Sequence, residues 1–303
     1  MKMASHAAAG TIPKVSVVIP TYNRSSTIKR AVASVLAQGF PIHEVIIVDD
    51  GSTDDTLEIL SKIKDSRIKV IQSPGRSGAP TARNLGVEAS SGEWIAFQDS
   101  DDYWFGHKLE SQFERIAMFP NSILCYCGLI QHYDGALGFV PGKSIHTFEG
   151  NLYEALLQTS FISTQTIVVK KSTFLESGGF RSDMPRLQDW ELVLRLAELG
   201  QFCCALEPLV VAYSTPGNLT SDARKGAIAR LAILDMHKQA FSAKPALLQK
   251  HYHIVAKQFL LTGSSADAVG YFWKATRLRP FALKSWFWLF VSIYKKFTGR
   301  KKA

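Results

Sequence analysis

Four short apolar runs alternate with amphipathic segments in the first hundred residues, and this alternation constrains the fold more than any other feature of the chain. The apolar runs are Val15–Ile19, Val45–Val48, Ile68–Ile71 and Trp94–Phe97. Continuous apolar runs of this length are typical of strands that are buried on both faces. Because the strands alternate with helical segments over short connections, we expect an α/β fold with a Rossmann-like, mostly parallel sheet flanked by helices.

The segments between and after these runs carry helix signals. Thr27–Gln38 places its apolar residues on one face. Ser52 can cap a second helix, with Asp55 three residues later as its partner. Pro80 suits the first turn of a third helix. Later in the chain the pattern is less regular and predicts a helix over Asn151–Thr159, a strand over Gln165–Val169, a helix over Asp189–Leu199 and a mostly helical segment after Leu219.

Composition is that of an ordinary globular protein, with 46% hydrophobic and 20% charged residues in 303. The segment Met1–Pro13 lacks the long apolar core of a signal peptide. We therefore expect the four cysteines, Cys125, Cys127, Cys203 and Cys204, to be reduced and mostly buried. Their C-x-C and C-C spacings are unusual for a zinc site, which makes that alternative the weaker one.

The net charge of +9 is concentrated at one end of the chain. Between Ala268 and Ala303 lie nine of the 35 basic residues and none of the 26 acidic residues, so the remainder is neutral. The protein therefore has a basic tail on a neutral body.

Conspicuous polar segments follow three of the predicted strands. They are Pro20–Asn23, Asp49–Asp50 and Asp99–Asp102. In parallel sheets ligands bind beyond the carboxyl ends of the strands, so these segments should converge in space. Asp99 and Asp101 are one residue apart on a turn and can both reach one divalent cation, for which hard oxygen ligands favour Mg²⁺ or Mn²⁺. A solvated turn is the alternative for such a motif.

The acidic stretch "VDDGSTDDT" allows two roles for its four aspartates. Asp49 and Asp50 leave the strand at the ligand edge, where a carboxylate can accept hydrogen bonds from a base imide or a ribose hydroxyl. Asp54 and Asp55 are better placed to meet the exposed N–H groups at a helix start. We expect the first pair to face a nucleotide and the second pair to cap the helix.

Four segments together resemble the family 2 glycosyltransferases: "VSVVIPTYNR", "VIIVDDGSTDDT", "GAPTARNLGVEASSGEWIAFQDSDD" and "GGFRSDMPRLQDWELVLRLAELG". The resemblance covers about residues 14–214. It implies an inverting enzyme with the glycosyltransferase-A fold that uses a nucleotide sugar, UDP-sugar being the expected donor. Residue by residue, it implies that Pro20, Tyr22, Asp50, Arg83 and Asp99 bind the nucleotide sugar, that Asp99 and Asp101 bind Mn²⁺ or Mg²⁺, and that Asp189 is the catalytic base.

The assignment of Asp189 as catalytic base has a physical rationale, and the sequence departs from the family pattern at two places. Transfer with inversion needs a carboxylate that takes the proton of the acceptor hydroxyl. Asp189 follows a glycine-bearing turn and begins a helix, so it can face a cleft, although an N-cap role suits it equally; Glu191 is the second candidate. Many family members carry an acid where this chain has Gln188, and a histidine in the loop that here reads "YSTPGNLTSD". These departures concern the protein ligands of the metal.

The C-terminal tail holds two features. Ser264–Pro280 resembles the second helix of a tetratricopeptide repeat, but a single unit favours a packed helical pair. Trp286–Tyr294 is almost wholly apolar and too short to span a bilayer. A polar stripe of Lys284, Ser292, Lys295 and Lys296 would complete a helix that lies on an anionic membrane. A core or dimer helix is the alternative.

The sequence therefore predicts a flexible N-terminal tail over residues 1–13, a catalytic domain over 14–218 and a helical region with a membrane-associating tail over 219–303. The expected function is transfer of a sugar to a saccharide or lipid-linked acceptor in cell-envelope polysaccharide or glycolipid synthesis, on the cytoplasmic face of the membrane. The alternatives are a sugar-nucleotidyltransferase, for which "PTYNRSSTIKR" lacks a glycine-rich loop, and a non-catalytic nucleotide-sugar-binding protein. A nucleic-acid partner is not expected, because the tail is too apolar for a surface that tracks phosphates.

Overall fold

The computed structural model describes residues 12–133, 136–142, 145–213 and 222–298. The chain forms two compact units, each described here by itself. Unit 1 comprises Met1–Leu156, Ser160–Arg181 and Leu192–Ser214, and unit 2 comprises Leu157–Thr159, Ser182–Glu191 and Thr215–Ala303. Most of the predicted N-terminal tail and the predicted boundary at residues 218–219 lie outside the described residues, so the domain limits stay predictions.

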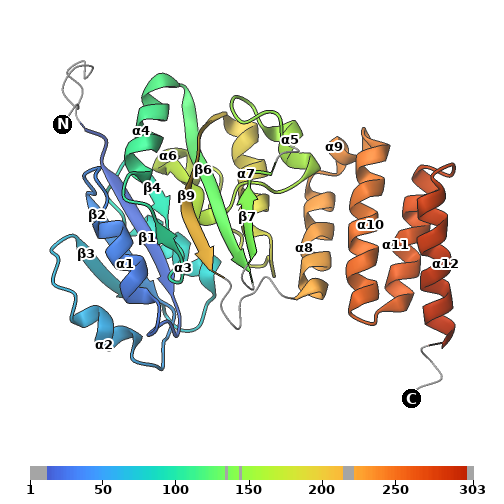
Figure 1. Ribbon diagram of the computed structural model, residues 1–303, viewed down its shortest axis with the longest axis horizontal. Helices are drawn as coiled ribbons and strands as arrows, with labels where there is room; N and C mark the ends of the chain where they lie inside the picture. Colours follow the sequence, from blue (N-terminus) through green and yellow to red (C-terminus); the bar gives the residue numbers. More distant parts are fainter. Residues whose placement is uncertain (1–11, 134–135, 143–144, 214–221, 299–303) are drawn as a thin grey trace. The chain divides into compact units, whose positions relative to one another are not determined.

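Unit 1 is built on one sheet, which has nine strands within the described residues (Figure 1). The strand order is β3-β2-β1-β4-β8-β6-β9-β5, and β7 pairs with β6. The strands are β1 (Val15–Thr21), β2 (Glu44–Asp49), β3 (Ile68–Gln72), β4 (Trp94–Phe97), β5 (Tyr103–Trp104), β6 (Ser122–Tyr133), β7 (Ala136–Val140), β8 (Val168–Lys170) and β9 (Gln201–Tyr213).

Strand direction changes across the sheet. The four predicted strands β1 to β4 are parallel neighbours, and β6 is parallel to β9. β8 lies antiparallel between β4 and β6, while β5 and β7 are antiparallel additions. The mostly parallel sheet flanked by helices is thus confirmed, and its antiparallel strands come from the half of the unit with the less regular sequence pattern.

Helices cover both faces of this sheet (Figure 1). The helices of the first half are α1 (Ile28–Leu36), α2 (Thr56–Ser61), α3 (Ala79–Glu88) and α4 (Lys108–Met118). The main core joins the sheet to α1, α2 and α4 and includes Val32, Leu60 and Phe113. On the opposite face, Ala82 of α3 packs on Ile46 and Val48. Because successive side chains of β2 point to opposite faces, its continuous apolar run fills both layers.

Two local predictions were wrong. Ser52 does not cap α2, because its hydroxyl accepts a hydrogen bond from the Asn23 N–H and the helix begins only at Thr56. The strand expected over Gln165–Val169 is split into a 3-10 turn (η1, Thr164–Thr166) and the short strand β8. The elements that follow in this part are α5 (Tyr153–Gln158), α6 (Lys171–Glu176) and α7 (Gln188–Leu199).

Unit 2 is mainly helical over its described residues 222–298. It contains α8 (Ala223–Met236), α9 (Lys238–Ser242), α10 (Pro245–Leu261), α11 (Ser265–Leu278) and α12 (Leu283–Thr298). Its core joins α8, α10, α11 and α12 through Ala227, Val255, Phe259, Phe272 and Leu289. The predicted helical pair in this region is therefore part of a larger helical array.

Helix α12 has an inward and an outward face. Ser285, Leu289 and Ser292 are buried. The predicted polar stripe was wrong in one respect, because Ser292 faces inward and its hydroxyl donates to the Leu289 carbonyl at 2.7 Å. The outward face carries large apolar side chains instead. Among the described residues, no helix is both long enough and apolar enough to cross a bilayer.

Candidate donor site at the carboxyl edge of the sheet

The polar segments that follow β1, β2 and β4 meet at one edge of unit 1. Thr21 pairs with Asp49 at the ends of β1 and β2, and Val18 of β1 pairs with Phe97 at the end of β4. Because these strands are parallel, Tyr22, Asp50 and Asp99 all leave the sheet at the same edge. The predicted convergence of these segments is confirmed.

Asp50 organises the loop that follows β3. Its Oδ1 accepts hydrogen bonds from the Ser73 hydroxyl at 2.6 Å and from the N–H and hydroxyl of Ser77, both at 2.8 Å. Its Oδ2 accepts from the Gly78 N–H at 2.7 Å. Burial alone would raise the pKa of Asp50, but these hydrogen bonds outweigh it and the pKa lies below its usual value. One lone pair of Oδ2 is left for a further donor.

The same loop places a cation over Tyr22. The Arg76 guanidinium lies 4.4 Å from the centroid of the Tyr22 ring, a cation–π contact. Asp49 differs from Asp50, because its Oδ2 accepts from the N–H groups of Gly51 and Ser52 and so closes the local turn. Tyr22 and Arg76 thus form the partly exposed surface of the site, and Asp49 lies beneath it, 1% exposed.

The acidic turn after β4 is held by arginines. Arg83 of α3 donates through Nη2 to Asp99 Oδ1 at 2.6 Å. Arg24 Nη2 lies 3.6 Å from Asp101 Oδ2, and Arg30 donates to the Asp101 carbonyl. The turn therefore combines carboxylates, which suit a cation, with guanidinium groups, which suit phosphate oxygens.

Asp102 is the buried member of the turn. It is 3% exposed and accepts hydrogen bonds from the Tyr213 N–H at 3.1 Å and from Gln165. Burial raises the pKa of Asp102 well above its ordinary value, and the negative charges of Asp99 and Asp101 raise it further. Asp102 ties the end of β9 to the acidic turn rather than facing a ligand.

The donor atoms of this turn fit a divalent cation in part. Asp99 and Asp101 can each supply one carboxylate oxygen, and Mg²⁺ or Mn²⁺ is commonly held by one or two carboxylates together with substrate phosphates and water. Within the ranges that the structure describes, no three His, Cys, Asp or Glu side chains are grouped to hold a metal without such help. Binding by Asp99 and Asp101 therefore stays a prediction, and it would depend on a bound diphosphate.

Asp189 lies in the first turn of α7 and belongs to unit 2. The carboxylate is half-buried, and its Oδ1 accepts from the Trp190 N–H at 2.8 Å. Leu187, two residues earlier, has φ 59°, a left-handed conformation that is strained for a leucine. Glu191 is fully buried, so it is less accessible to an acceptor than Asp189. The role of Asp189 as base stays a prediction.

Sequence reasoning missed several residues of the site. Arg24 directly follows the polar segment Pro20–Asn23, and this position next to predicted ligand residues could have indicated its role. Arg76, Gln165 and Tyr213 could not be found in this way, because only the folded chain brings them to the strand ends. The four cysteines are buried and free, as predicted.

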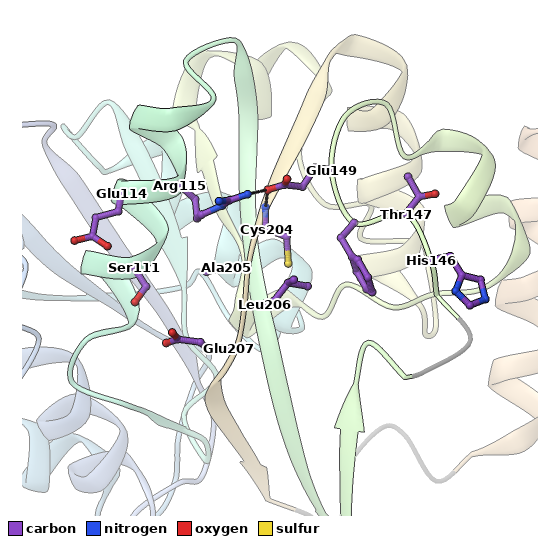
Figure 2. A pocket seen from close by; sticks show the side chains of 11 residues that line it. Ser111, Glu114, Arg115, His146, Thr147, Glu149, Cys204, Ala205, Leu206 and Glu207 are labelled. Atoms are coloured by element: carbon purple, nitrogen blue, oxygen red, sulfur yellow. Dashed lines mark hydrogen bonds and ion pairs between the residues drawn. The ribbon is translucent and has the colours of Figure 1, made fainter.

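A separate pocket of about 560 Å³ lies on unit 1, away from the carboxyl edge (Figure 2). Its lining comes from α4, the segment 146–149 and the first half of β9. The Arg115–Glu149 ion pair lies in its wall, and Glu149 also accepts from the Cys204 N–H at 3.2 Å. None of the predicted site residues lines this pocket.

A mostly parallel sheet with a charged site at its carboxyl edge is typical of α/β proteins that bind their ligands at that edge. The sequence model of the family "Glycosyl transferase family 2" matches residues 16–178, which is more than half of the chain. The chain belongs to this family.

Curated relatives also match part of the chain. The putative teichuronic acid biosynthesis glycosyltransferase TuaG of Bacillus subtilis (strain 168) is 38% identical over 162 residues, covering 52% of this chain and 63% of TuaG. The Escherichia coli UDP-Glc:alpha-D-GlcNAc-diphosphoundecaprenol beta-1,3-glucosyltransferase WfaP is 48% identical over 98 residues, covering 32% of this chain and 39% of WfaP. The chain thus spans less than two thirds of the length of either relative.

A solved structure supports the fold beyond the matched family domain. The crystal structure of S. aureus TarS 1-349 superposes with a TM-score of 0.64 at 22% identity, covering 88% of this chain and 81% of that one. A second TarS 1-349 structure is in complex with UDP-GlcNAc. At this level of identity the likeness concerns the fold alone.

Proposed function

We propose that this protein is an inverting glycosyltransferase that moves a sugar from a UDP-sugar to a saccharide or lipid-linked acceptor of the cell envelope. The observation that carries the proposal is the convergence of Tyr22, Asp50, Arg83 and Asp99 at one edge of the sheet in a family 2 member. The names of WfaP and TuaG support the envelope-polysaccharide context and a diphospholipid-linked acceptor.

Different residues of unit 1 would bind different parts of the donor. Tyr22 and Arg76 offer an aromatic face and a cation to the nucleobase, and Asp50 Oδ2 can accept from a base imide or ribose hydroxyl. Arg83 and Arg24 would meet the diphosphate while Asp99 and Asp101 hold Mn²⁺ or Mg²⁺. When bound, such an ion stabilises negative charge on the leaving diphosphate.

Asp189 would act on the acceptor. As the acceptor oxygen forms a bond to C1 of the sugar, the bond from C1 to the diphosphate oxygen breaks and the hydroxyl proton passes to the Asp189 carboxylate. One displacement of this kind inverts the configuration at C1. A nucleotidyltransferase or a non-catalytic binding protein would not need a carboxylate in this role.

A ligand panel tests the proposal. A ligand that binds only the folded state raises apparent stability, so thermal unfolding should be followed with UDP-glucose, UDP-N-acetylglucosamine and other nucleotide sugars, with and without Mn²⁺. At least one UDP-sugar should raise the midpoint, and more so with Mn²⁺. Transfer to a synthetic diphospholipid-linked N-acetylglucosamine should follow for that donor. No stabilisation by any nucleotide sugar would contradict the proposal.

We also propose that α12 holds the protein on the cytoplasmic face of an anionic membrane. Its outward side chains recur three and four residues apart and therefore form one stripe along the helix. These side chains and their exposed fractions are Leu283 82%, Phe287 60%, Phe290 62%, Tyr294 70% and Phe297 67%, and Phe281 just before the helix is 96% exposed. Exposed aromatic stripes of this size mark interaction surfaces.

The basic residues near this stripe indicate that its partner is an anionic membrane. Lys284 and Lys295 are exposed on the same helix, and six basic residues of the tail lie in α11 or α12 or between them: Lys274, Arg277, Arg279, Lys284, Lys295 and Lys296. Aromatic side chains beside lysines suit the interface of an anionic bilayer, where each nearby basic residue contributes about 1 kcal/mol. The basic residues Arg300, Lys301 and Lys302 lie outside the described residues.

Vesicle sedimentation tests this part of the proposal. The wild-type chain should pellet with phosphatidylglycerol vesicles, less in high salt, and barely with phosphatidylcholine vesicles. Replacing Phe287 and Phe290 by serine should abolish pelleting, whereas Leu261→Ser, at an even more exposed apolar position on α10, should not. Equal pelleting of all three chains, or none by the wild type, would contradict it. Dimerisation that the Phe287 and Phe290 changes abolish would assign the stripe to a second copy instead.

A further inference from the structure

Trp190, which directly follows Asp189, is in contact with two side chains of the C-terminal helices that are hydrogen-bonded to each other. The indole is fully buried. The Arg230 guanidinium of α8 lies 4.7 Å from its ring centroid, and the His251 imidazole of α10 stacks on it at 5.6 Å with 29° between the planes. All three residues, like Asp189, belong to unit 2.

Hydrogen bonds fix the orientation of the Arg230 and His251 side chains beside Trp190. Arg230 Nη1 lies 2.9 Å from His251 Nδ1, and His251 Nε2 lies 2.8 Å from the Leu157 carbonyl oxygen. Because a guanidinium only donates, Nδ1 accepts from Arg230 and Nε2–H donates to Leu157. Burial, helped by the Arg230 charge, lowers the pKa of His251 to about 4, so the imidazole is neutral near pH 7. The Arg230 side chain is thus aligned on the Trp190 ring.

The N-cap residue of α8, Asp222, contacts the segment that precedes α7. Arg186 donates through Nη1 to the Asp222 carbonyl at 2.8 Å. A Cβ at Gly226 would lie 3.0 Å from this Nη1, so the glycine lets the guanidinium pass close to the helix. The strained Leu187 lies between the two contacts, and a strained backbone persists only where its surroundings hold it in place.

From these contacts we propose that Arg230 is a positioning residue for Asp189. It holds Trp190, and through Trp190 it fixes the first turn of α7 and the direction of the Asp189 carboxylate. The inference rests on the proposed role of Asp189 as base. It makes α8 and α10 part of the transfer machinery, in addition to any membrane role of α12.

A double-mutant cycle tests this inference. The variants are Arg230→Met, Asp189→Asn and the two combined, assayed for UDP release from UDP-glucose and from UDP-N-acetylglucosamine with diphospholipid-linked N-acetylglucosamine as acceptor. Arg230→Met should lower kcat about tenfold, because small misplacements of a reacting group are costly. Its KM for the donor, and its affinity and stoichiometry for UDP, should stay at wild-type values, since the predicted donor residues lie in unit 1. In the Asp189→Asn background the same change should cost nothing further.

Two further variants separate positioning from folding. Arg224→Met removes an exposed arginine of α8 that donates to the Ser264 hydroxyl at 2.9 Å, and it should keep wild-type kcat. Arg230→Lys keeps the charge but loses the planar guanidinium, so kcat should fall while the protein stays folded. If Arg230→Met does not fold, the cycle is run with Arg230→Lys.

Independent losses that multiply in the double variant would overturn the inference, as would wild-type kcat for both Arg230 variants. If Asp189→Asn itself transfers sugar at the wild-type rate, the base assignment fails, and the positioning role fails with it. That outcome is distinguishable from failure of the Arg230 positioning role alone, in which Asp189→Asn is inactive and the Arg230 variants are not.

Discussion

The Arg83 guanidinium donates to the Asp99 carboxylate at 2.6 Å and links α3 to the acidic turn after β4. The Arg83 side chain is only 10% exposed and the Asp99 side chain 26%, so the pair is partly shielded from solvent. Charge-assisted hydrogen bonds of this kind are stronger than neutral ones. The ion pair keeps the Arg83 guanidinium beside Asp99, whose carboxylate is predicted to bind the metal.

Replacing Arg83 should therefore weaken donor binding. Arg83→Gln removes a positive charge that would face the diphosphate and frees Asp99 from its partner. The affinity for UDP should fall about tenfold, which corresponds to the loss of one charge-assisted hydrogen bond. Calorimetric titration measures this. Arg67→Gln is the control, because it breaks an arginine–aspartate ion pair, with Asp65 at 2.8 Å, that is more exposed at the arginine and lies at the start of β3. Equal effects of the two changes would contradict the assignment.

We expect Asp50 to stabilise the loop after β3 in addition to binding the nucleotide. Asp50→Asn turns an amide N–H toward donors of Ser73, Ser77 or Gly78 and leaves them without an acceptor. We expect the free energy of unfolding to fall by about 1–3 kcal/mol, and UDP affinity to fall as well. Urea unfolding and calorimetry check the two effects. Wild-type stability and weakened UDP binding together would mean that Asp50 only contacts the nucleotide.

The buried Lys108 should make the free energy of unfolding depend on pH. It is fully buried, and burial lowers the pKa of its ammonium from 10.5 to about 8. Between these pH values the unfolded chain binds a proton that the folded chain does not, so stability should rise as the pH rises from 8 toward 10.5. Lys108→Met should remove this rise. It should also stabilise the protein near pH 7 by about 1–3 kcal/mol, after the loss of the Lys108 bond to Gln112.

Urea unfolding at pH 7 and pH 9.5 checks this prediction. The wild type should gain stability between the two values and the variant should not. A wild type with equal stability at both, beside a variant that is less stable at pH 7, would show that the buried ammonium is well accommodated by the Trp104 ring, 3.8 Å away.

Asp189→Asn should separate binding from transfer. The amide cannot take a proton from the acceptor, so the transfer rate should fall by about 10²-fold or more while UDP affinity stays the same. An unfolded variant would instead indicate that the hydrogen bond from the Trp190 N–H at 2.8 Å is mainly a helix cap. Circular dichroism distinguishes that outcome from a folded but inactive protein.

The first half of unit 1 could be predicted from the sequence because its signals are local. Apolar runs predicted β1 to β4, and helical periodicity and Pro80 predicted α1 and α3, nearly at their observed bounds, whereas α2 begins later than the predicted cap at Ser52. The long strands β6 and β9 could not be predicted in this way, because they mix buried and exposed residues and owe their stability to pairing with each other. Non-local pairing leaves little trace in a short window of sequence.

The candidate site divides in the same way. Asp50 and Asp99 are found by their position after apolar runs, but the loop that Asp50 holds and the Arg83 partner of Asp99 depend on the fold. The contacts of Arg230 and His251 with Trp190 could not be predicted, because these residues lie 40 and 61 residues later in the chain, on helices without a functional motif.

The most direct test of a metal-assisted UDP-sugar site at this edge is the affinity of UDP with Mn²⁺ and with chelator, for the wild type and for Asp101→Asn. Asp101 lies 3.6 Å from Arg24 and is a predicted ligand of the metal. The wild type should bind UDP at least about tenfold more tightly with Mn²⁺ than with chelator, since the ion bridges carboxylates and phosphates. Asp101→Asn should lose most of this difference. A wild type that binds UDP equally well under both conditions, or not at all, would contradict the account.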